Sequence, residues 1–203
     1  QDVIASLYGK KSIKSFLKNF SKDVFIPICV GGGIKEINDV LTLMNEGADK
    51  VSLNTHALLN PNFINELVKN FGSSTICINI EVKNIDNEFK LIINNGRDLI
   101  KKKFEDWVME IQDRGVGEIH INSIDNDGME NGVNYKLLDV IKNMNIKVPV
   151  IYSGGFNIDL DEENLMSLSK FIDGLAIGYN LHKNNKFLKK DDLWFRDSNF
   201  KTK

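Results

Sequence analysis

Short apolar runs rich in Val and Ile alternate with longer amphipathic stretches, and this alternation limits the possible folds more than any other feature of the chain. The runs predicted as strands are Asp2–Ala5, Ile26–Val30, Lys50–Asn54, Thr75–Lys83, Glu118–Ser123, Val148–Ser153 and Ile172–Ile177. The stretches predicted as helices are Ile13–Phe20, Glu36–Asn45, Pro61–Phe71, Asp98–Arg114, Tyr135–Met144 and Glu162–Phe171. Strands and helices in strict alternation are typical of a parallel α/β sheet or barrel.

An internal repeat favours a barrel over an open sheet. VGGGI at Val30–Ile34 is echoed by YSGGF at Tyr152–Phe156, and each follows an apolar strand that contains proline. An open dinucleotide-binding sheet is the competitor, but Glu36 stands where the third glycine of a G-x-G-x-x-G fingerprint would be. We therefore predict a (β/α) barrel, in which the loops after the strands carry the chemistry.

Two smaller features complete the predicted organisation. Phe89–Ile93 alternates polar and apolar residues and is followed by Asn95-Gly96, which predicts a small hairpin inserted after a long strand. The chain from residue 183 to 203 is rich in Lys, Asn and Asp, and its structure is left open. The predicted division is a barrel over residues 1–182 and a tail over 183–203.

Bulk properties exclude several classes of protein. A length of 203 residues suits one domain, and a net charge of -2 gives no general attraction to nucleic acid or to an anionic membrane. No apolar run approaches the roughly 20 residues of a membrane-spanning helix. Cys29 and Cys77 lie in apolar strand-like runs, and we interpret both as buried thiols of a reducing cytosol. We therefore expect a cytoplasmic protein without a metal or cofactor.

Two glycine-rich turns follow predicted strands, and each has a second short turn as its partner. The pairs are Gly31–Gly33 with Asn54-Thr55, and Gly154-Gly155 with Gly178-Tyr179. Such turns can serve tight packing of a strand on a helix, or they can present backbone N–H groups to an anion. Two anion cradles on one face would suit a long ligand with a phosphate at each end.

Two carboxylates close a strand in the sequence SIDNDG. Asp125 and Asp127 are ordinary turn residues on one interpretation, because Asp hydrogen-bonds readily to nearby backbone. On the other interpretation, one of them is a general acid or base on the catalytic face. The residues alone leave both interpretations open.

Side-chain alternation along three strands predicts a polar barrel interior. The residues expected to face inward are Lys50, Ser52 and Asn54; Cys77, Asn79 and Glu81; and Glu118, His120 and Asn122. Polar groups inside a barrel are costly unless they are paired or hydrated. Either Lys50 and Glu118 form a pair that closes the bottom of the barrel, or the interior is a polar passage.

These motifs together resemble the cyclase subunit of imidazole glycerol phosphate synthase, a family of histidine-biosynthesis (β/α)8 barrels. The resemblance is carried by VGGGI, GADKVSLNT, GVGEIHINSIDNDG and the SGG turn, in this order and spacing. It runs from Asp2 to about His182. The opening DVIASLYGKK resembles the end of the family's second strand. A TIM (β/α)8 barrel that lacks its first strand, its first helix and the start of its second strand is therefore expected.

The resemblance implies a reaction and a partner. The family's substrate is a linear bisphosphorylated ribulosyl-aminoimidazole carboxamide, which is held at two phosphate sites. Ammonia from a glutaminase subunit, docked below the barrel as a heterodimer, crosses the interior. The barrel then cleaves and cyclises the substrate to imidazole glycerol phosphate.

The resemblance also implies roles for particular residues. One phosphate site falls at Gly31, Gly32, Gly33, Asn54 and Thr55, and the other at Ser153, Gly154, Gly155, Gly178 and Tyr179. Asp127 falls on the family's general acid, and Glu81 stands where the family has a functional Asp. Lys50 and Glu118 fall on the charged gate at the ammonia entrance.

The departures from the family pattern leave two alternatives open. The family's catalytic base lies on the first strand, which this sequence does not contain, and Glu81 replaces Asp. A paralogous branch has a similar barrel and supplies ammonia for amidation of a nucleotide-linked sugar in surface-polysaccharide biosynthesis. A barrel without its base would instead be a silent docking scaffold for a glutaminase.

Overall fold

The structure is a computed structural model that describes residues 13–22, 24–156 and 166–178. The predicted strand Asp2–Ala5, the tail at 183–203 and the predicted phosphate-site residue Tyr179 lie outside the described residues. The predicted helix Glu162–Phe171 is described only from Met166, with helical backbone at 166–168.

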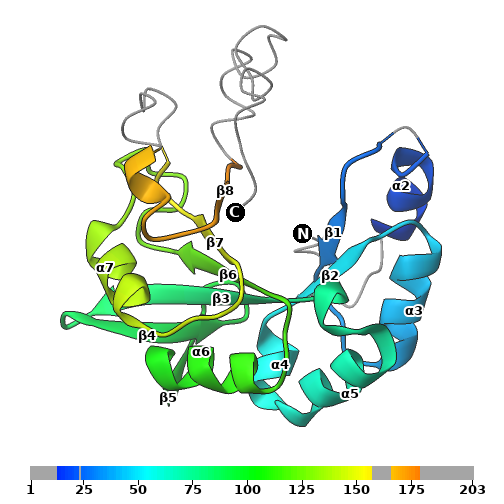
Figure 1. Ribbon diagram of the computed structural model, residues 1–203, viewed down its shortest axis with the longest axis horizontal. Coiled ribbons are helices and arrows are strands. Elements are labelled where there is room, and N and C mark those ends of the chain that lie inside the picture. The colour runs from blue at the N-terminus through cyan, green and yellow to red at the C-terminus, as the bar shows by residue number, and fades with distance from the viewer. Residues whose placement is uncertain (1–12, 23, 157–165, 179–203) are drawn as a thin grey trace, which may run out of the picture.

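Parallel strands form one curled sheet, in which neighbours in space are successive parallel strands of the chain (Figure 1). Their order is β1 (Cys29–Gly31), β2 (Lys50–Leu53), β3 (Ile76–Ile85), β6 (Glu118–Ser123), β7 (Val150–Ser153) and β8 (Gly174–Ala176). Each pair along this path is parallel. The predicted strands in the described residues are confirmed, with ends moved by a few positions. The curled parallel sheet is the described part of a (β/α) barrel.

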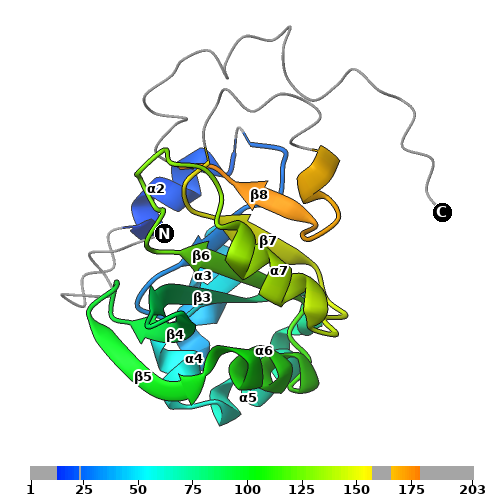
Figure 2. The ribbon, with the colours of Figure 1, turned by 90° about the vertical axis from the view of Figure 1, so that its left-hand side faces the viewer.

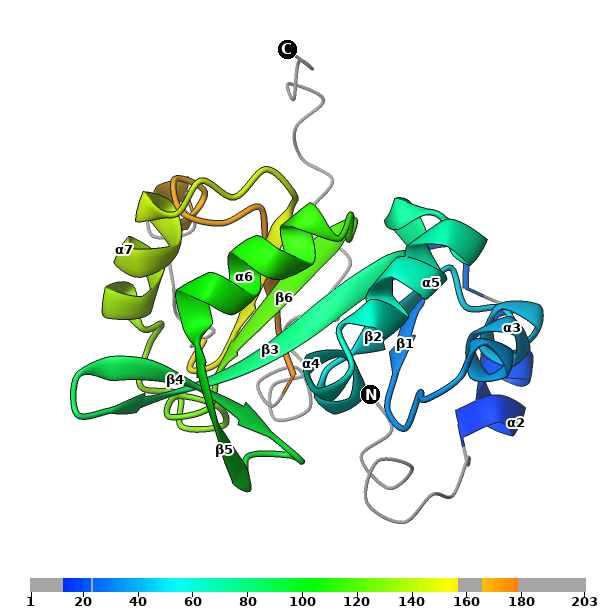
Figure 3. The same cartoon turned by 90° about the horizontal axis from the view of Figure 1, so that it is seen from below.

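Helices cover the outer side of this sheet, as Figures 2 and 3 show for α5, α6 and α7. The helices are α2 (Ile13–Phe20), α3 (Ile37–Asn45), α4 (Thr55–Leu59), α5 (Asn62–Phe71), α6 (Phe104–Asp113) and α7 (Tyr135–Asn143), with a 3-10 turn η1 (Ser73–Thr75). The short helix α4 was not predicted from the sequence. The pattern of α5 explains its position, because Phe63, Ile64 and Leu67 lie on one face and are buried.

The predicted hairpin is confirmed, but the helix predicted directly after it is wrong at its start. β4 (Glu88–Ile93) pairs antiparallel with β3, and a further strand, β5 (Asp98–Lys103), pairs antiparallel with β4. The sequence analysis predicted a helix over Asp98–Arg114, whereas the helix begins only at Phe104. Pairing with β4 gives the backbone of the Lys-rich segment its hydrogen bonds, and this tertiary contact overrides local propensity.

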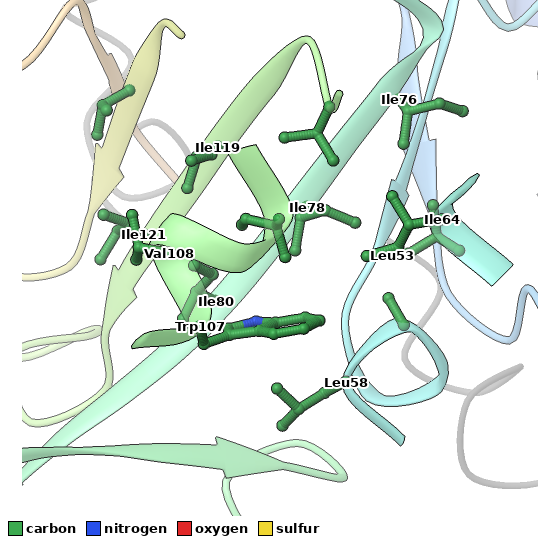
Figure 4. Packing of buried hydrophobic residues seen from close by; sticks show 14 of the residues in the cluster. Leu53, Leu58, Ile64, Ile76, Ile78, Ile80, Trp107, Val108, Ile119 and Ile121 are labelled. Atoms are coloured by element: carbon green, nitrogen blue, oxygen red, sulfur yellow. The ribbon is translucent and has the colours of Figure 1, made fainter. Parts of the chain in front are cut away.

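The hydrophobic core lies between the outer face of the sheet and the helices. In Figure 4, Ile78 and Ile80 of β3 lie near Trp107 and Val108 of α6, and all four are at most 2% exposed. The strand residues recur at every second position, which places all of them on one face of the sheet. The apolar set of each strand is therefore used for helix packing, and the alternate set is left for the inner face.

The two cysteines differ in environment. Cys77 on β3 is buried, as predicted, but Cys29 on β1 is exposed, which corrects the prediction of two buried thiols. The physical reason is position, because β1 is an edge strand of the described sheet and Cys29 is its first residue. Both cysteines are free thiols.

Adjacent positions on α5 test this account of the core. Leu67 is 0% exposed, whereas its neighbour Glu66 is exposed. Leu67→Ala is expected to lower the free energy of unfolding by about 2–5 kcal/mol, because it leaves a cavity under the sheet. Glu66→Ala should change it by less than about 0.5 kcal/mol. Urea denaturation followed by circular dichroism measures both, and similar losses in the two variants would contradict the placement of α5.

Candidate active site

The inner face of the sheet is polar along its central strands. Strand register pairs Asn79 of β3 with His120 of β6, and Glu81 with Asn122. Because residues in register on parallel strands face the same side, the side chains predicted to point inward do lie on one face. The prediction from alternation is confirmed for these strands.

An ion pair joins the first residues of β2 and β6. Lys50 Nζ lies 2.5 Å from Glu118 Oε2, and the two side chains are 31% and 18% exposed. The hydrogen bond from Lys50 to Glu118 raises the pKa of the lysine, because the carboxylate favours the charged ammonium. The predicted pair therefore forms at the strand starts, opposite the glycine turns. Because both side chains are partly exposed, solvent screens the pair, and its contribution to the free energy of unfolding is small.

The two glycine turns have nearly the same backbone. Gly32 and Gly33 have φ angles of 116° and 67°, and Gly154 and Gly155 have φ angles of 111° and 78°. Residues with a Cβ rarely adopt these positive φ angles, so each of the four positions requires glycine. The sequence repeat is thus a repeat of one backbone turn, placed after β1 and after β7. Gly31 does not have a positive φ, but a Cβ there would lie 2.6 Å from the carbonyl oxygen of Ser52, as one on Gly154 would lie 2.5 Å from that of Ser123, so both glycines also allow close strand packing.

Each glycine turn lines a cavity on the same face of the sheet. The first cavity, of about 340 Å³, is lined by residues that include Gly32, Gly33, Asn54, Thr55, Asn94 and Asn95. The second cavity, of about 260 Å³, is lined by residues that include His120, Asn122, Asp127, Ser153, Gly154, Gly155 and Gly178. Asn79 lines both cavities. The structure therefore places Gly32, Gly33, Asn54 and Thr55 at the first cavity and Ser153, Gly154, Gly155 and Gly178 at the second, while Gly31 lines neither. Binding of phosphate at these residues stays a prediction.

Two backbone N–H groups between the first glycine turn and α3 are already engaged by a side chain. Asp39 Oδ2 accepts hydrogen bonds from the backbone N–H groups of Lys35 and Glu36, at 3.0 and 3.3 Å. The helix thus caps its own first N–H groups with a side chain from its first turn. The N–H groups of Lys35 and Glu36 are therefore not available to an anion in the first cavity, which Lys35, Asn54 and Thr55 also line.

Asp127 is oriented by a chain of hydrogen bonds on the inner face. Asn122 Nδ2 donates to Asp127 Oδ2 at 3.4 Å, and Ser153 Oγ donates to Asn122 Oδ1 at 2.9 Å. Ser153 Oγ also lies 2.8 Å from His120 Nε2. Since the serine proton goes to Asn122, the histidine donates from Nε2. Burial lowers the pKa of His120, so the ring is neutral at pH 7.

Asp125 has a different task from Asp127. Its Oδ2 accepts a hydrogen bond from the backbone N–H of Asn84 at 2.6 Å, which ties the loop after β6 to the end of β3. Asp127 instead lines the second cavity. The two interpretations left open for SIDNDG therefore separate by residue, with Asp125 as a structural turn residue and Asp127 as the candidate for chemistry.

Glu81 is a buried carboxyl group held beside the site. It is 8% exposed, and its Oε2 accepts a hydrogen bond from the backbone N–H of Gly96 at 3.2 Å. Burial raises the pKa of Glu81, and the nearby charge of Asp127 acts in the same direction, while hydrogen bonds from Gly96 and Asn54 oppose the shift. A carboxyl with a raised pKa is suited to donate a proton near neutral pH.

The hairpin between β4 and β5 contributes residues that the sequence analysis did not place in the site. Thr55 Oγ1 accepts a hydrogen bond from the backbone N–H of Asn94 at 3.1 Å, which fixes the hairpin tip at the first cavity. The Asn-Gly pair signalled a turn at this point. The position of this turn beside the first cavity depends on how the whole hairpin packs against the sheet. No local sequence pattern encodes that packing.

The described part of the chain has neither a membrane-spanning helix nor a metal centre. No helix there is long and apolar enough to cross a membrane. No group of three or more His, Cys, Asp or Glu side chains among these residues is arranged to hold a metal ion.

Comparison with known proteins agrees with this architecture. Residues 1–186 match the family model described as histidine biosynthesis protein. The chain is 42% identical over 154 residues to the imidazole glycerol phosphate synthase subunit HisF of Campylobacter concisus. This match covers 76% of this chain and 61% of that protein. It is 34% identical over 204 residues to the subunit of the same name from Dictyoglomus thermophilum, covering 96% of this chain and 79% of that protein.

The fold and the site define a (β/α) barrel with two glycine-turn cavities on the face after the strands. The chain belongs to the histidine biosynthesis protein family. It spans about three fifths of the length of several of the curated relatives it matches, including those from Campylobacter concisus and Helicobacter hepaticus.

The raised pKa of Glu81 predicts a pH-dependent effect of Glu81→Gln. Gln keeps the shape of the side chain and cannot ionise. At low pH the folded wild-type protein carries a neutral carboxyl and the two proteins differ least. As pH rises from the ordinary carboxyl range to the raised pKa, wild type loses stability relative to the variant, by up to about 1.4 kcal/mol per pH unit.

Urea denaturation of both proteins between about pH 4 and pH 8 measures this difference. A difference that stays constant over the whole range would show that Glu81 titrates alike in the folded and unfolded states.

Proposed function

We propose that this chain is the cyclase barrel of an imidazole glycerol phosphate synthase. In this role it uses ammonia to cleave and cyclise a bisphosphorylated ribulosyl-aminoimidazole carboxamide, and imidazole glycerol phosphate is the product. The observation that carries the proposal is the pair of cavities with matching glycine turns, which flank one polar strand on the same face. The names of the relatives, at 34% and 42% identity, support this reaction.

The two cavities suit the two ends of such a substrate. The glycine turns at Gly32-Gly33 and Gly154-Gly155 leave room for a phosphate against bare backbone, and bound phosphate requires no basic side chain there. A substrate anchored at both ends lies across the inner face between them. Anchoring both ends removes much of the entropy that a cyclisation must otherwise lose in its transition state.

In this proposal, the carboxyl groups of Asp127 and Glu81 transfer protons to and from the middle of the substrate. Asp127 lines the second cavity and is held by Asn122, so it can give or take a proton at a fixed position. Glu81 lies near it, and burial raises the pKa of Glu81, so this second carboxyl is more easily protonated than an ordinary one. Two neighbouring carboxyls in different environments allow one site to supply both an acid and a base.

Ammonia would enter at the opposite end of the barrel. The Lys50–Glu118 pair closes the inner face at the strand starts, and polar side chains continue from there toward Asp127. A glutaminase subunit docked below this pair, as a heterodimer in the cytoplasm, is part of the proposal. Opening of the pair would admit ammonia while the closed pair excludes water.

A role in amidation of a nucleotide-linked sugar remains the second candidate, because Glu81 stands where the histidine-pathway barrels have Asp. The two roles separate in a growth test. Complementation of a histidine-requiring strain by the full protein should restore growth without histidine. Absence of growth, together with no turnover of the bisphosphate with free ammonium, would contradict the proposed reaction.

Substitution of the two loop carboxylates tests the assignment of the acid. Asp127→Asn is expected to lower ammonia-dependent kcat by about 10²–10⁴-fold with little change in KM, because the variant cannot transfer a proton. Asp125→Asn on the same loop is the matched control, since an amide oxygen can still accept the hydrogen bond from Asn84. Steady-state kinetics measures both. A loss of kcat below about tenfold in Asp127→Asn would show that Asp127 is only a turn residue.

Substitution at the barrel entrance tests the ammonia route. Glu118→Gln should weaken turnover driven by glutamine and the glutaminase much more than turnover fed with external ammonium, because bulk ammonia can also enter from the open face. Glu110→Gln is the matched control, since Glu110 lies on the outer helix α6 and pairs with Lys102 of β5 and with Arg114. Equal losses for Glu118→Gln in both assays would mean that the pair is only structural.

A further inference from the structure

Three hydrogen bonds beside the second cavity all run in one direction. His120 Nε2 lies 2.8 Å from Ser153 Oγ. Ser153 Oγ donates to Asn122 Oδ1 at 2.9 Å, and Asn122 Nδ2 donates to Asp127 Oδ2 at 3.4 Å. All four side chains belong to residues that line the second cavity. The chain of donors therefore starts at His120 and ends on the carboxylate of Asp127.

The two middle members of this chain do not fix its direction. The Ser153 hydroxyl can both donate and accept, and the Asn122 amide carries an acceptor and a donor on one plane. A half-turn of this amide exchanges its oxygen and its nitrogen with almost no change of shape. The same residues could therefore form the reversed chain, in which Asn122 turns its oxygen toward Asp127. Two acceptor oxygens would then face each other, and Asp127 would lose its donor.

His120 is the member that can fix the direction. A neutral imidazole has one donor nitrogen and one acceptor nitrogen. With the proton on Nε2, His120 donates to Ser153, and the serine proton is left for Asn122. With the proton on Nδ1, Nε2 would be an acceptor and would take the serine proton instead. The direction of the whole chain therefore follows from the tautomer of one ring.

The surroundings of His120 favour the neutral ring that this selection requires. His120 lies on the inner face of β6, in register with Asn79 of β3. Burial lowers the pKa of His120, while the charges of Glu118 and Asp127 act in the opposite direction. Because the ring is neutral, only one of its nitrogens is a donor, and its tautomer decides which way the chain runs.

We propose that His120 is a positioning residue for Asp127. Its Nε2–H group sets the direction of the chain through Ser153 and Asn122, so that Asn122 presents an N–H group and not an oxygen to the carboxylate. Asp127 is thereby held at a fixed place in the lining of the second cavity. The reaction in which Asp127 acts rests on the proposed function, whereas the direction of the chain does not.

Two substitutions of His120 in the full protein test the inference by steady-state kinetics. His120→Leu removes the donor and is expected to lower ammonia-dependent kcat by about 10–100-fold with little change in KM, because Asp127 is then poorly placed. His120→Gln is the conservative variant, since the Gln amide nitrogen can take the place of Nε2 and donate to Ser153. It should recover most of the lost kcat. If His120→Leu does not fold, His120→Asn, whose shorter amide does not reach Ser153, replaces it with the same loss expected.

Nitrogen-15 NMR of His120 measures the direction of the chain without any reaction. At about pH 7, the wild-type ring should be neutral and carry its proton on Nε2, and this proton should give a low-field signal that exchanges slowly with water. Ser153→Ala removes the acceptor of this proton, so the low-field signal should disappear. The spectrum of His120→Gln identifies which signals belong to this ring.

Tyr152→Phe is the matched control for stability. Tyr152 precedes Ser153 on β7, is 0% exposed and lies on the opposite face of the sheet. Its hydroxyl oxygen accepts a hydrogen bond from the backbone N–H of Asn134 at 2.9 Å. This variant removes a buried hydrogen bond outside the cavity, so its urea midpoint should fall while its kcat stays unchanged.

Each outcome decides for or against the inference. A proton on Nδ1 of the wild-type His120 ring overturns it, because Ser153 would then donate to the ring. An unchanged kcat in His120→Leu overturns it, and so do equal losses in His120→Leu and His120→Gln, since a donor at this place would then have no effect. A wild-type protein that does not convert the bisphosphate contradicts the proposed function, and the NMR result then decides the direction of the chain by itself.

Discussion

Side-chain alternation along β3 and β6 is the constraint on which the rest of this structure depends. In a strand, successive side chains face opposite sides, so one set of residues must pack under the helices while the other lines the interior. Here Ile78 and Ile119 belong to the set that faces the helices, and Asn79 and His120 belong to the set that faces inward. A shift of register by one residue would place polar groups in the core, so the core itself fixes the position of every candidate site residue.

The site is built from two similar halves that are completed in different ways. The same turn, with nearly equal φ angles, follows β1 and β7 and opens a cavity in each half. The first cavity is bordered by the tip of the hairpin, which Thr55 holds through Asn94. The second is bordered by the loop that carries Asp127. Repetition therefore provides two similar cavities, and the hairpin beside the first and the Asp127 loop beside the second make them unlike.

Polar groups on the inner face are nearly all committed to each other. His120, Ser153 and Asn122 form a chain that ends on Asp127, and Glu81 is held by the hairpin through Gly96. Such a network holds its members in fixed orientations because each alternative position would leave a buried group without a partner. Asn79 lines both cavities, and among the described residues its buried Oδ1 has no hydrogen-bond partner.

The sequence by itself determined the class of fold, the repeated glycine turns and the inward set of polar residues. All of these depend on local periodicity or on a glycine requirement, and both can be read from neighbouring residues. Tertiary structure alone decided that Asp98–Lys103 is a strand, that Lys50 pairs with Glu118, and that Asp125 is structural while Asp127 lines a cavity. Each of these depends on which group lies across from it in space, and the partners come from separate elements. Local pattern specifies what a residue can do, and only the packed chain decides which partner it meets.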